Sequence, residues 1–304
     1  MSFSVDLIRH LYHFTPHYFE IDGRRCHYLD EGEGDPIIML HGNPSWSFMY
    51  RELIGPLQRS HRVIVPDHIG CGLSDKPSDE QYSYRLEQRV TDLEALLEEI
   101  GADRDITLVM HDWGGPIGMG YASRHPARVA RFVIFNTTAF LLPAGKQLHW
   151  TLRFCRNSSI AAFLIRRFNL FAWCAGRVGF RARALPGEVR RAYRGPYDSW
   201  ENRIAILRFV QDIPLTGEDA SYEVLRRTQE SLPEFRETPM LICWGENDFV
   251  FDADFLDEWT RRFPQAEVHR FSEAGHYVLE DMCQSIIPLV RSFVASNPVR
   301  HQPK

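Results

Sequence analysis

Three polar residues, far apart in the chain, have the types and the order that covalent catalysis needs. Asp112 stands just after the apolar run Ile106–Met110. Asp248 comes shortly after a second such run, Met240–Trp244, and His276 follows later in the chain. A carboxylate is ionised at neutral pH, so it can attack an sp3 carbon without a base and form an alkyl ester. The sequence therefore predicts Asp112 as a nucleophile, His276 as a base against that ester, and Asp248 as the acid beside the base.

The residues around Asp112 are typical of a nucleophile elbow, in which a buried strand runs through a sharp turn into a helix. Asp112 occupies the position where such enzymes usually have Ser, and Met110 stands where Gly is common. Gly114 and Gly115 allow the following helix to approach the sheet closely. Nucleophile, acid and base also follow one another in the order of α/β-hydrolases. The alternative is an Asp that only caps the helix beginning at Trp113.

A second loop predicts the groups that stabilise a leaving anion. His-Gly-Asn-Pro, ending at Pro44, directly follows the apolar run Pro36–Leu40. In this fold class such a loop supplies a backbone N–H to the oxyanion hole, so the backbone N–H groups of Asn43 and Trp113 form the predicted pair. Their side chains, an amide and an indole, are also donors, and we expect both beside Asp112. The alternative is a turn-forming Asn and a core Trp.

The elements that must position these residues follow from hydrophobic patterning. Six short apolar runs predict buried strands of a parallel sheet, at Pro36–Leu40, Arg62–Pro66, Ile106–Met110, Val129–Phe135, Met240–Trp244 and Ala266–Phe271. Helical patterns alternate with them, at Tyr84–Ile100, Gly115–His125, Ala253–Phe263 and Glu280–Ser296. This alternation predicts an α/β fold, a mostly parallel central sheet with helices on both faces.

The alternation stops after Phe135 and resumes near Met240, which predicts an inserted helical cap. We place the cap at residues 139–217 and the core at residues 1–138 and 218–304. From Ala139 to Glu218 the chain has 13 Lys and Arg against 5 Asp and Glu, a net charge of +8, whereas the whole chain carries −5. The remainder therefore carries −13.

Within the cap, Ile160–Trp173 is both basic and strongly apolar. Such a stretch suits the lining of a tunnel, a contact with a lipid surface or a contact with a partner protein. The alternative is a cap helix that packs its apolar face on the core.

The composition excludes several classes of protein. With 304 residues, 44% of them hydrophobic and 25% charged, the chain has the balance of a soluble globular protein. No apolar stretch approaches the roughly 20 residues of a membrane span, and the N-terminus lacks a signal-peptide pattern, so we predict a cytoplasmic protein. The net negative charge disfavours nucleic acid as a partner. Six scattered cysteines without a CxxC pair predict reduced core thiols, and neither a metal nor an organic cofactor is implied.

Five segments resemble the haloalkane dehalogenase family: HGNPSWSFMYR at 41–51, PDHIGCGLSDKP at 66–77, HDWGG at 111–115, WGEND at 244–248 and AGH at 274–276. The resemblance implies the α/β-hydrolase fold. It also implies an Asp–His–Asp triad of Asp112, His276 and Asp248, with Asn43 and Trp113 as the pair that holds the halide.

Branches of this family differ in where the acid lies. Asn136, after the predicted strand Val129–Phe135, is not acidic, which favours Asp248. The segment from Tyr197 to Leu215 resembles the cap of the third branch, which includes the OleB-type β-lactone decarboxylases of bacterial long-chain olefin biosynthesis. That resemblance implies conversion of a cis-3,4-dialkyl β-lactone, a small hydrophobic substrate, to a cis-alkene and CO2. It also implies a β-lactone synthetase and other enzymes of the same pathway as partners.

Three other functions remain open at this point. A haloalkane dehalogenase would use the same residues to hydrolyse a carbon–halogen bond. An epoxide hydrolase would share the Asp nucleophile and use cap tyrosines such as Tyr193 and Tyr197, although Asn43 argues against it. A noncatalytic receptor built on this core predicts a broken triad, whereas all three members are present in order.

Overall fold

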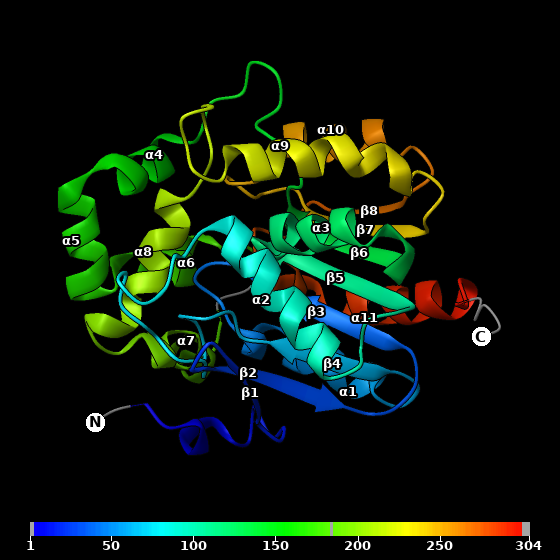
Figure 1. Cartoon of the computed structure of the whole chain (residues 1–304), viewed down its shortest axis with the longest axis horizontal. Coiled ribbons are helices and arrows are strands. Elements are labelled where there is room, and N and C mark those ends of the chain that lie inside the picture. The colour runs from blue at the N-terminus through cyan, green and yellow to red at the C-terminus, as the bar shows by residue number, and fades with distance from the viewer. Residues whose placement is uncertain (1–2, 183–184, 300–304) are drawn as a thin grey trace.

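The computed structural model describes residues 3–182 and 185–299, and a single eight-stranded sheet runs through its centre (Figure 1). The strands are β1 His17–Ile21, β2 Arg24–Glu31, β3 Pro36–Leu40, β4 Arg62–Pro66, β5 Ile106–Asp112, β6 Val129–Thr137, β7 Met240–Gly245 and β8 Glu267–Phe271. Their order across the sheet is β1-β2-β4-β3-β5-β6-β7-β8. From β4 to β8 neighbouring strands are parallel, whereas β1 and β2 are antiparallel to their neighbours.

All six predicted strands are confirmed, and β3 and β4 have the predicted bounds. The extension of β5 as far as Asp112 places this residue at the carboxyl edge of the sheet. The sequence pattern missed β1 and β2. Both are partly exposed strands that mix polar and apolar residues, and apolar runs identify only strands that are buried on both faces.

Helices cover both faces of the sheet. Those of the core are α1 Arg51–Leu57, α2 Leu86–Glu99, α3 Gly114–Arg124, α9 Tyr222–Ser231, α10 Ala253–Arg262 and α11 Val278–Ser296. α1 and α11 pack together on one face, while α2, α3 and α9 pack in sequence on the other. Two apolar clusters, one on each side of the sheet, fill the core. The predicted fold, an α/β hydrolase with a mostly parallel sheet, is confirmed.

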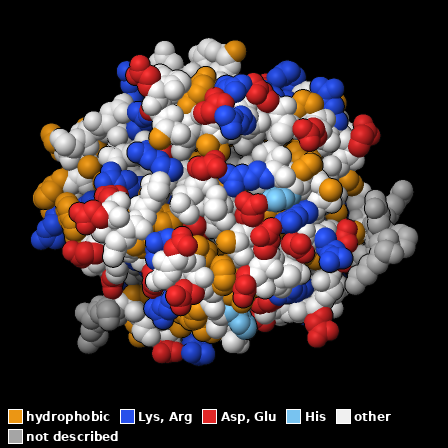
Figure 2. All heavy atoms as spheres, viewed as in Figure 1, with side chains coloured by type: hydrophobic (Ala, Val, Ile, Leu, Met, Phe, Trp, Pro, Cys, Tyr) orange, Lys and Arg blue, Asp and Glu red, His pale blue; other side chains and the backbone are white. Residues whose placement is uncertain are grey.

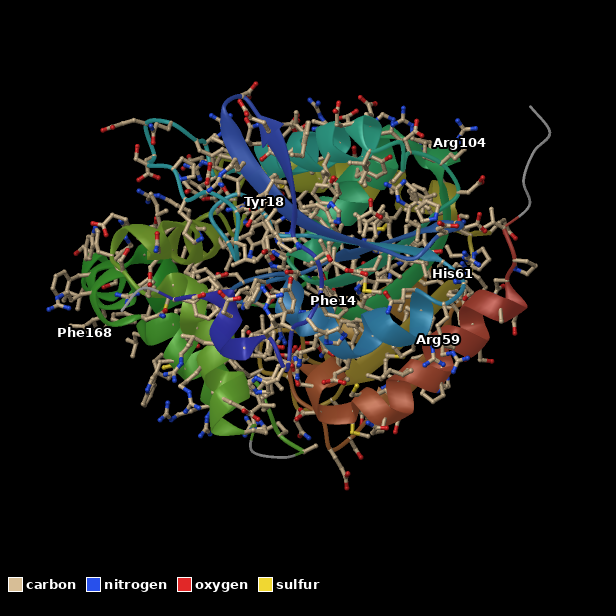
Figure 3. The ribbon with its side chains drawn as sticks, turned by 90° about the horizontal axis from the view of Figure 1, so that it is seen from below. Phe14, Tyr18, Arg59, His61, Arg104 and Phe168 are labelled. Atoms are coloured by element: carbon tan, nitrogen blue, oxygen red, sulfur yellow. The ribbon has the colours of Figure 1, made fainter. Side chains whose placement is uncertain are left out.

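Five further helices lie between β6 and β7 and gather at one end of the sheet (Figure 1). They are α4 Trp150–Asn157, α5 Ser159–Phe168, α6 Leu170–Val178, α7 Gly187–Arg194 and α8 Ile204–Gln211. α4, α5 and α8 pack together, and α6 bridges α5 and α7. The view from below shows Phe168 at the outer end of this group (Figure 3). We call these helices the cap; its bounds as a separate unit, residues 139–217, stay a prediction.

Short 3-10 helices occur in the connections of the described chain, at Val5–Ile8, Ser47–Tyr50, Pro126–Arg128, Gly195–Tyr197, Glu201–Arg203 and Leu232–Phe235. Within the described residues, no helix has both the length and the apolar character needed to cross a membrane.

Candidate active site

The end of β5 forms a sharp turn that presents Asp112. This residue has φ = 51°, in the left-handed region that non-glycine residues rarely adopt. A Cβ atom at Gly114 would collide with the carbonyl oxygen of Leu40, and one at Gly115 would collide with the side chain of Thr137. Glycine at these two positions therefore allows α3 to begin directly behind the strained residue. The strained backbone points the carboxylate of Asp112 into the cavity described below.

Backbone donors hold the carboxylate of Asp112. The Asn43 N–H donates to Asp112 Oδ1 at 2.6 Å, and the backbone N–H of Trp113 also contributes. Burial raises the pKa of Asp112 above its ordinary value, although these donors and the charge of His276 oppose the rise. The predicted pair of backbone N–H groups thus lies at the predicted nucleophile.

The two side-chain donors have different surroundings. The Asn43 amide Nδ2 donates to the carbonyl of Ile206 in α8 at 3.1 Å, and its Oδ1 has no partner among the described residues. The Trp113 indole packs against Phe209, with 5.3 Å between ring centroids. Both residues line the cavity next to Asp112. One amide hydrogen of Asn43 is therefore bound to the cap, which the sequence did not indicate, and the role of this pair as anion donors stays a prediction.

His276 lies between two carboxylates. Its Nδ1 is 2.8 Å from Asp248 Oδ2, and its Nε2 is 3.7 Å from Asp112 Oδ2. Burial lowers the pKa of His276, but the charge and hydrogen bond of Asp248, together with the charge of Asp112, outweigh it and raise the pKa above the ordinary value. The three residues predicted from chain order therefore lie together at the carboxyl edge of the sheet.

Two neighbours orient this group, and sequence reasoning assigned a role to neither of them. The Asn136 amide, near the end of β6, donates to Asp248 Oδ2 at 3.0 Å. The Nε2 atom of His111 lies 2.8 Å from the backbone oxygen of His276. The position of Asn136 at the end of the strand between β5 and β7 is the signal that could have identified it. We regard both as positioning residues.

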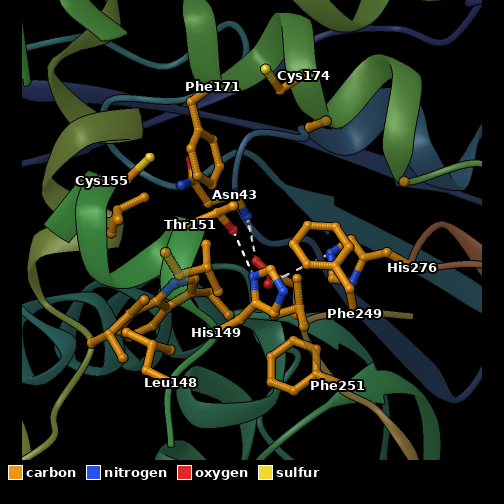
Figure 4. A pocket seen from close by; sticks show the side chains of 18 of the residues that line it. Asn43, Leu148, His149, Thr151, Cys155, Phe171, Cys174, Phe249, Phe251 and His276 are labelled. Carbon is orange, nitrogen blue, oxygen red and sulfur yellow. Dashed lines mark hydrogen bonds and ion pairs between the residues drawn. The ribbon is translucent and has the colours of Figure 1, made fainter. Parts of the chain in front are cut away.

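Asp112 lines a cavity of about 630 Å³ between the core and the cap. Figure 4 shows other side chains of this lining from close by. Most of the lining is apolar, and α4, α5 and α6 supply much of it. The ring of Phe251 stacks near His276, at 5.9 Å between centroids, and Phe249 lies beside it. A volume of this size accommodates an elongated apolar ligand.

Two cysteines of the cavity wall correct the sequence-based prediction of six core thiols. Cys155 and Cys174 are only half-buried and line the cavity (Figure 4). The other four are buried, as predicted, at positions 26, 71, 243 and 283. Among the described residues, no group of His, Cys, Asp and Glu side chains could hold a metal ion.

The two cap tyrosines considered for epoxide opening have structural partners. The Tyr193 hydroxyl donates to Glu280 at 2.6 Å, and Glu280 also forms a buried ion pair with Arg51. The Tyr197 hydroxyl donates to the backbone oxygen of Ser45 at 2.8 Å. Neither tyrosine belongs to the described lining of the cavity. The site therefore lacks the tyrosine acids that the epoxide hydrolase alternative requires from these positions.

Comparisons with known proteins identify the family of this chain. A family model described as the alpha/beta hydrolase fold matches residues 35–281. A cis-3-alkyl-4-alkyloxetan-2-one decarboxylase of Shewanella oneidensis is 50% identical over 281 residues, which cover 92% of this chain and 88% of that protein. A protein of the same name from Xanthomonas campestris pv. campestris is 46% identical over 296 residues, covering 95% and 98%.

Among solved structures, a haloalkane dehalogenase from Bradyrhizobium elkani USDA94 matches with a TM-score of 0.84 and 26% identity, covering 93% of this chain and 98% of that one. The chain belongs to the α/β-hydrolase fold family, and the relatives it matches there include oxetanone decarboxylases and haloalkane dehalogenases.

Proposed function

We propose that this protein is a β-lactone decarboxylase that converts cis-3-alkyl-4-alkyloxetan-2-ones to cis-alkenes and CO2. The observation that carries the proposal is the carboxylate of Asp112 at the floor of an apolar cavity of about 630 Å³, with His276 beside it. The two oxetanone decarboxylases at 50% and 46% identity support the substrate class. An apolar cavity suits a lactone with two alkyl chains, because the chains gain by leaving water.

In the first step, a carboxylate oxygen of Asp112 attacks the ring carbon that bears the ring oxygen. The bond from that carbon to the ring oxygen breaks, and its electron pair leaves with the oxygen. The products are an alkyl–aspartyl ester and a free carboxylate on the neighbouring carbon. The raised pKa of His276 favours the imidazolium form, whose charge would stabilise this carboxylate. Asn43 and Trp113 would donate to the same anion.

In the second step, the bond between the neighbouring carbon and the carboxylate breaks and CO2 leaves. The electron pair of that bond forms the alkene, and the ester C–O bond breaks to return the carboxylate of Asp112. The attack inverts the ring carbon, and an anti elimination then places the two alkyl chains on the same side of the double bond. The sequence of steps consumes no water and accounts for a cis product from a cis lactone.

A haloalkane dehalogenase is the second candidate, and the match to a solved haloalkane dehalogenase favours it. Asp112 would attack the carbon that bears the halogen, and Asn43 and Trp113 would hold the departing halide. His276 would then act as a base, taking a proton from the water that cleaves the ester. The two functions thus share the first attack and differ in how the ester is broken.

The direct test offers both substrate classes to the purified protein. A long-chain cis-3,4-dialkyl β-lactone should give a cis-alkene, measured by gas chromatography with mass spectrometry. 1-Bromohexane and 1,2-dibromoethane should release halide slowly or not at all. Fast halide release without alkene would overturn the decarboxylase and leave the dehalogenase. The Asp112→Ala variant, assayed in parallel, controls for uncatalysed loss of CO2 from the lactone.

The proposed function also implies partner enzymes. A β-lactone with long alkyl chains would come from a β-lactone synthetase, and other enzymes of olefin biosynthesis would precede it. Co-purification of the protein with such a synthetase tests this partnership. A cytoplasmic location stays a prediction, which fractionation of cells that express the protein would test.

A further inference from the structure

A groove between α6 and α7 gathers positive charge on the outside of the cap. Its volume is about 230 Å³, and four of its lining residues are Arg177, Arg190, Arg191 and Arg194. We call these four residues the arginine groove. In the described part of the chain none of the four is paired with a carboxylate. Glu188, on the same helix, pairs with His10 instead.

The charges in the arginine groove act on one another. Burial and the charges of Arg177, Arg190 and Arg191 lower the pKa of Arg194. Such crowding is unfavourable in the free protein, and an anion in the groove would relieve it. The cap region from Ala139 to Glu218 carries +8 while the rest of the chain carries −13, so the groove lies in the basic part of the molecule.

Large apolar side chains lie exposed on the same end of the molecule. The exposed fractions are 72% for Trp150, 66% for Ile160, 60% for Phe168 and 52% for Phe163. We call these four residues the apolar edge. Figure 2 shows hydrophobic and basic side chains side by side where Figure 1 places α5, and Figure 3 shows Phe168 pointing outward there. A cluster of this kind marks a contact surface, because monomeric proteins rarely expose large apolar patches.

Arginine and aromatic side chains are paired across this surface. Arg177 lies over the ring of Trp173 at 3.5 Å, and Arg167 lies over Phe168 at 5.2 Å. This alternation of guanidinium groups and aromatic rings fits the interfacial zone of a bilayer. There the rings enter the boundary between headgroups and acyl chains while the charged groups reach the phosphates.

One helix connects this surface to the substrate cavity. On α6, Phe171 and Cys174 line the cavity, whereas Trp173 and Arg177 lie on the other side and line the groove between α6 and α7. The rim of the cavity is also exposed and apolar, since Trp150, with 72% of its surface exposed, belongs to its lining. An apolar molecule could therefore pass between the cavity and a surface in contact with the cap without crossing open water.

We propose that the outer surface of the cap docks on a bilayer that contains anionic phospholipid. The arginine groove binds lipid phosphates, the apolar edge enters the interface, and the cavity rim faces the lipid. An acidic protein would neutralise the arginines but would leave Trp150, Ile160 and Phe168 in water unless it also offered an apolar face. The bilayer meets both requirements. The proposal goes beyond the catalytic function and does not depend on it, because docking requires no turnover.

Vesicle binding tests the proposal directly. The full chain is sedimented with vesicles of mixed phosphatidylglycerol and phosphatidylcholine, and with vesicles of phosphatidylcholine alone. We expect binding to the mixed vesicles that weakens as salt rises, and binding to the neutral vesicles that is at least about tenfold weaker. Absence of binding to the mixed vesicles at low salt would overturn the proposal.

Two matched variants distinguish the effect of the arginine groove on vesicle binding from the effect of net charge. R177Q/R190Q/R191Q should weaken binding to the mixed vesicles by about a hundredfold. The control R226Q/R227Q/R261Q removes the same charge from α9 and α10, where each arginine is paired with a glutamate, and should leave binding within about twofold. Equal losses in both triple variants would overturn the proposal.

The apolar edge is tested on its own. I160S/F163S leaves the cavity lining and all arginines in place and should weaken vesicle binding about tenfold. In the unaltered chain, brominated lipid should quench tryptophan fluorescence, and W150F/W173F should lose most of that quenching. Unchanged vesicle binding in I160S/F163S, together with displacement by inorganic phosphate, would show a site for soluble anions and contradict docking on a bilayer. Circular dichroism of each variant checks the fold.

Discussion

The active-site edge of the sheet buries polar groups, whereas the outer surface of the cap exposes apolar ones. At the sheet edge, buried carboxylates each have partners: Asp112 accepts from the Asn43 N–H, and Asp248 accepts from Asn136. On the cap, apolar side chains such as Trp150 are exposed. Buried carboxylates that accept hydrogen bonds keep one geometry, as covalent chemistry requires. An unpartnered surface instead indicates a contact that the isolated chain does not make.

A third buried carboxylate, Asp67, extends this contrast to the region behind the active site. Asp67 accepts hydrogen bonds from the backbone N–H groups of Ser47 and Leu73, at 2.7 and 2.8 Å, and His27 Nδ1 lies 2.8 Å away. Asp67 therefore ties the loop that carries Asn43 to the loop after β4. The sheet edge is thus held by carboxylates on both sides of the predicted nucleophile.

The largest expected effect comes from the nucleophile. Asp112→Asn should reduce alkene formation by more than about 10⁴-fold, because an amide cannot attack the lactone carbon. The fold should persist, since the change removes a buried carboxylate whose pKa burial already raises. Single-turnover assays with a long-chain lactone measure the loss. Turnover above about one-thousandth of the unaltered rate would show that the active-site edge does not act through this carboxylate.

His276→Phe should separate the two candidate functions. A dehalogenase needs a base for the second step, so halide release should stop after one equivalent and a covalent ester should accumulate on Asp112. A decarboxylase needs no water, so alkene formation should continue at a rate reduced by about 10²-fold through the lost charge. Mass spectrometry of the intact protein detects the ester. A variant that neither forms an ester with a haloalkane nor releases alkene from a lactone would contradict both schemes.

The pH dependence of the unaltered protein should also separate the two candidate functions, because the two activities should change with pH in opposite directions. The pKa of His276 lies above its ordinary value of 6.5 because of Asp248 and Asp112, despite burial. If the imidazolium stabilises the leaving carboxylate, alkene formation falls as pH rises through that pKa. If the neutral imidazole acts as a base, halide release rises over the same interval. Profiles of kcat/KM for both substrates measure the direction, and Asp112 should limit both on the acid side as it becomes protonated.

A smaller effect, on stability, concerns Asp67. Burial would raise its pKa, but the charge and hydrogen bond of His27, the charge of His41 and the Leu73 N–H lower it from 3.8 to about 2. This shift contributes about 2 kcal/mol of folding free energy above pH 4 or so, and the contribution is lost as pH falls toward 2. Asp67→Asn should therefore destabilise the protein by at least that amount at pH 7 and flatten the acid limb of its stability curve.

Urea unfolding at several pH values checks this prediction. Asp22→Asn serves as the control, because that carboxylate is exposed and pairs with Arg24 at the surface. An Asp67→Asn variant that keeps the full stability at pH 7 would show that the bonded carboxylates at the sheet edge are not what holds its geometry.

The positions of the three candidate residues could be predicted because a short local pattern surrounds the first and chain order indicates the other two. A buried strand, a sharp turn and a glycine-rich helix start surround Asp112, and chain order then indicates Asp248 and His276. Contacts between distant segments could not be predicted in this way. The Asn43 amide binds the carbonyl of Ile206, 163 residues away, and no local pattern specifies that pair.

Two further failures of prediction have the same origin. β1 and β2 form by pairing at the sheet edge, so they do not need the continuous apolar run that marks a central strand. Cys155 and Cys174 were expected in the core because cysteine is usually buried. They line the cavity because α4 and α6 face it within the cap. The local sequence of a helix does not specify the angle at which it packs on another helix, so this position could not be predicted.

The smallest effect we predict lies where the two regions meet, at the cap wall of the cavity. Cys174→Phe adds a ring to the lining contributed by α6 and should shorten the space available to an alkyl chain. For the longest lactones kcat/KM should fall about tenfold, while short-chain lactones should react as before, because Asp112 and His276 keep their partners in the core. The control Cys283→Ala changes a buried thiol of α11 that does not line the cavity. A uniform loss for all chain lengths in Cys174→Phe would mean that the cap affects the reaction itself and not only the binding of long chains. The proposed separation of the two roles between core and cap would then be wrong.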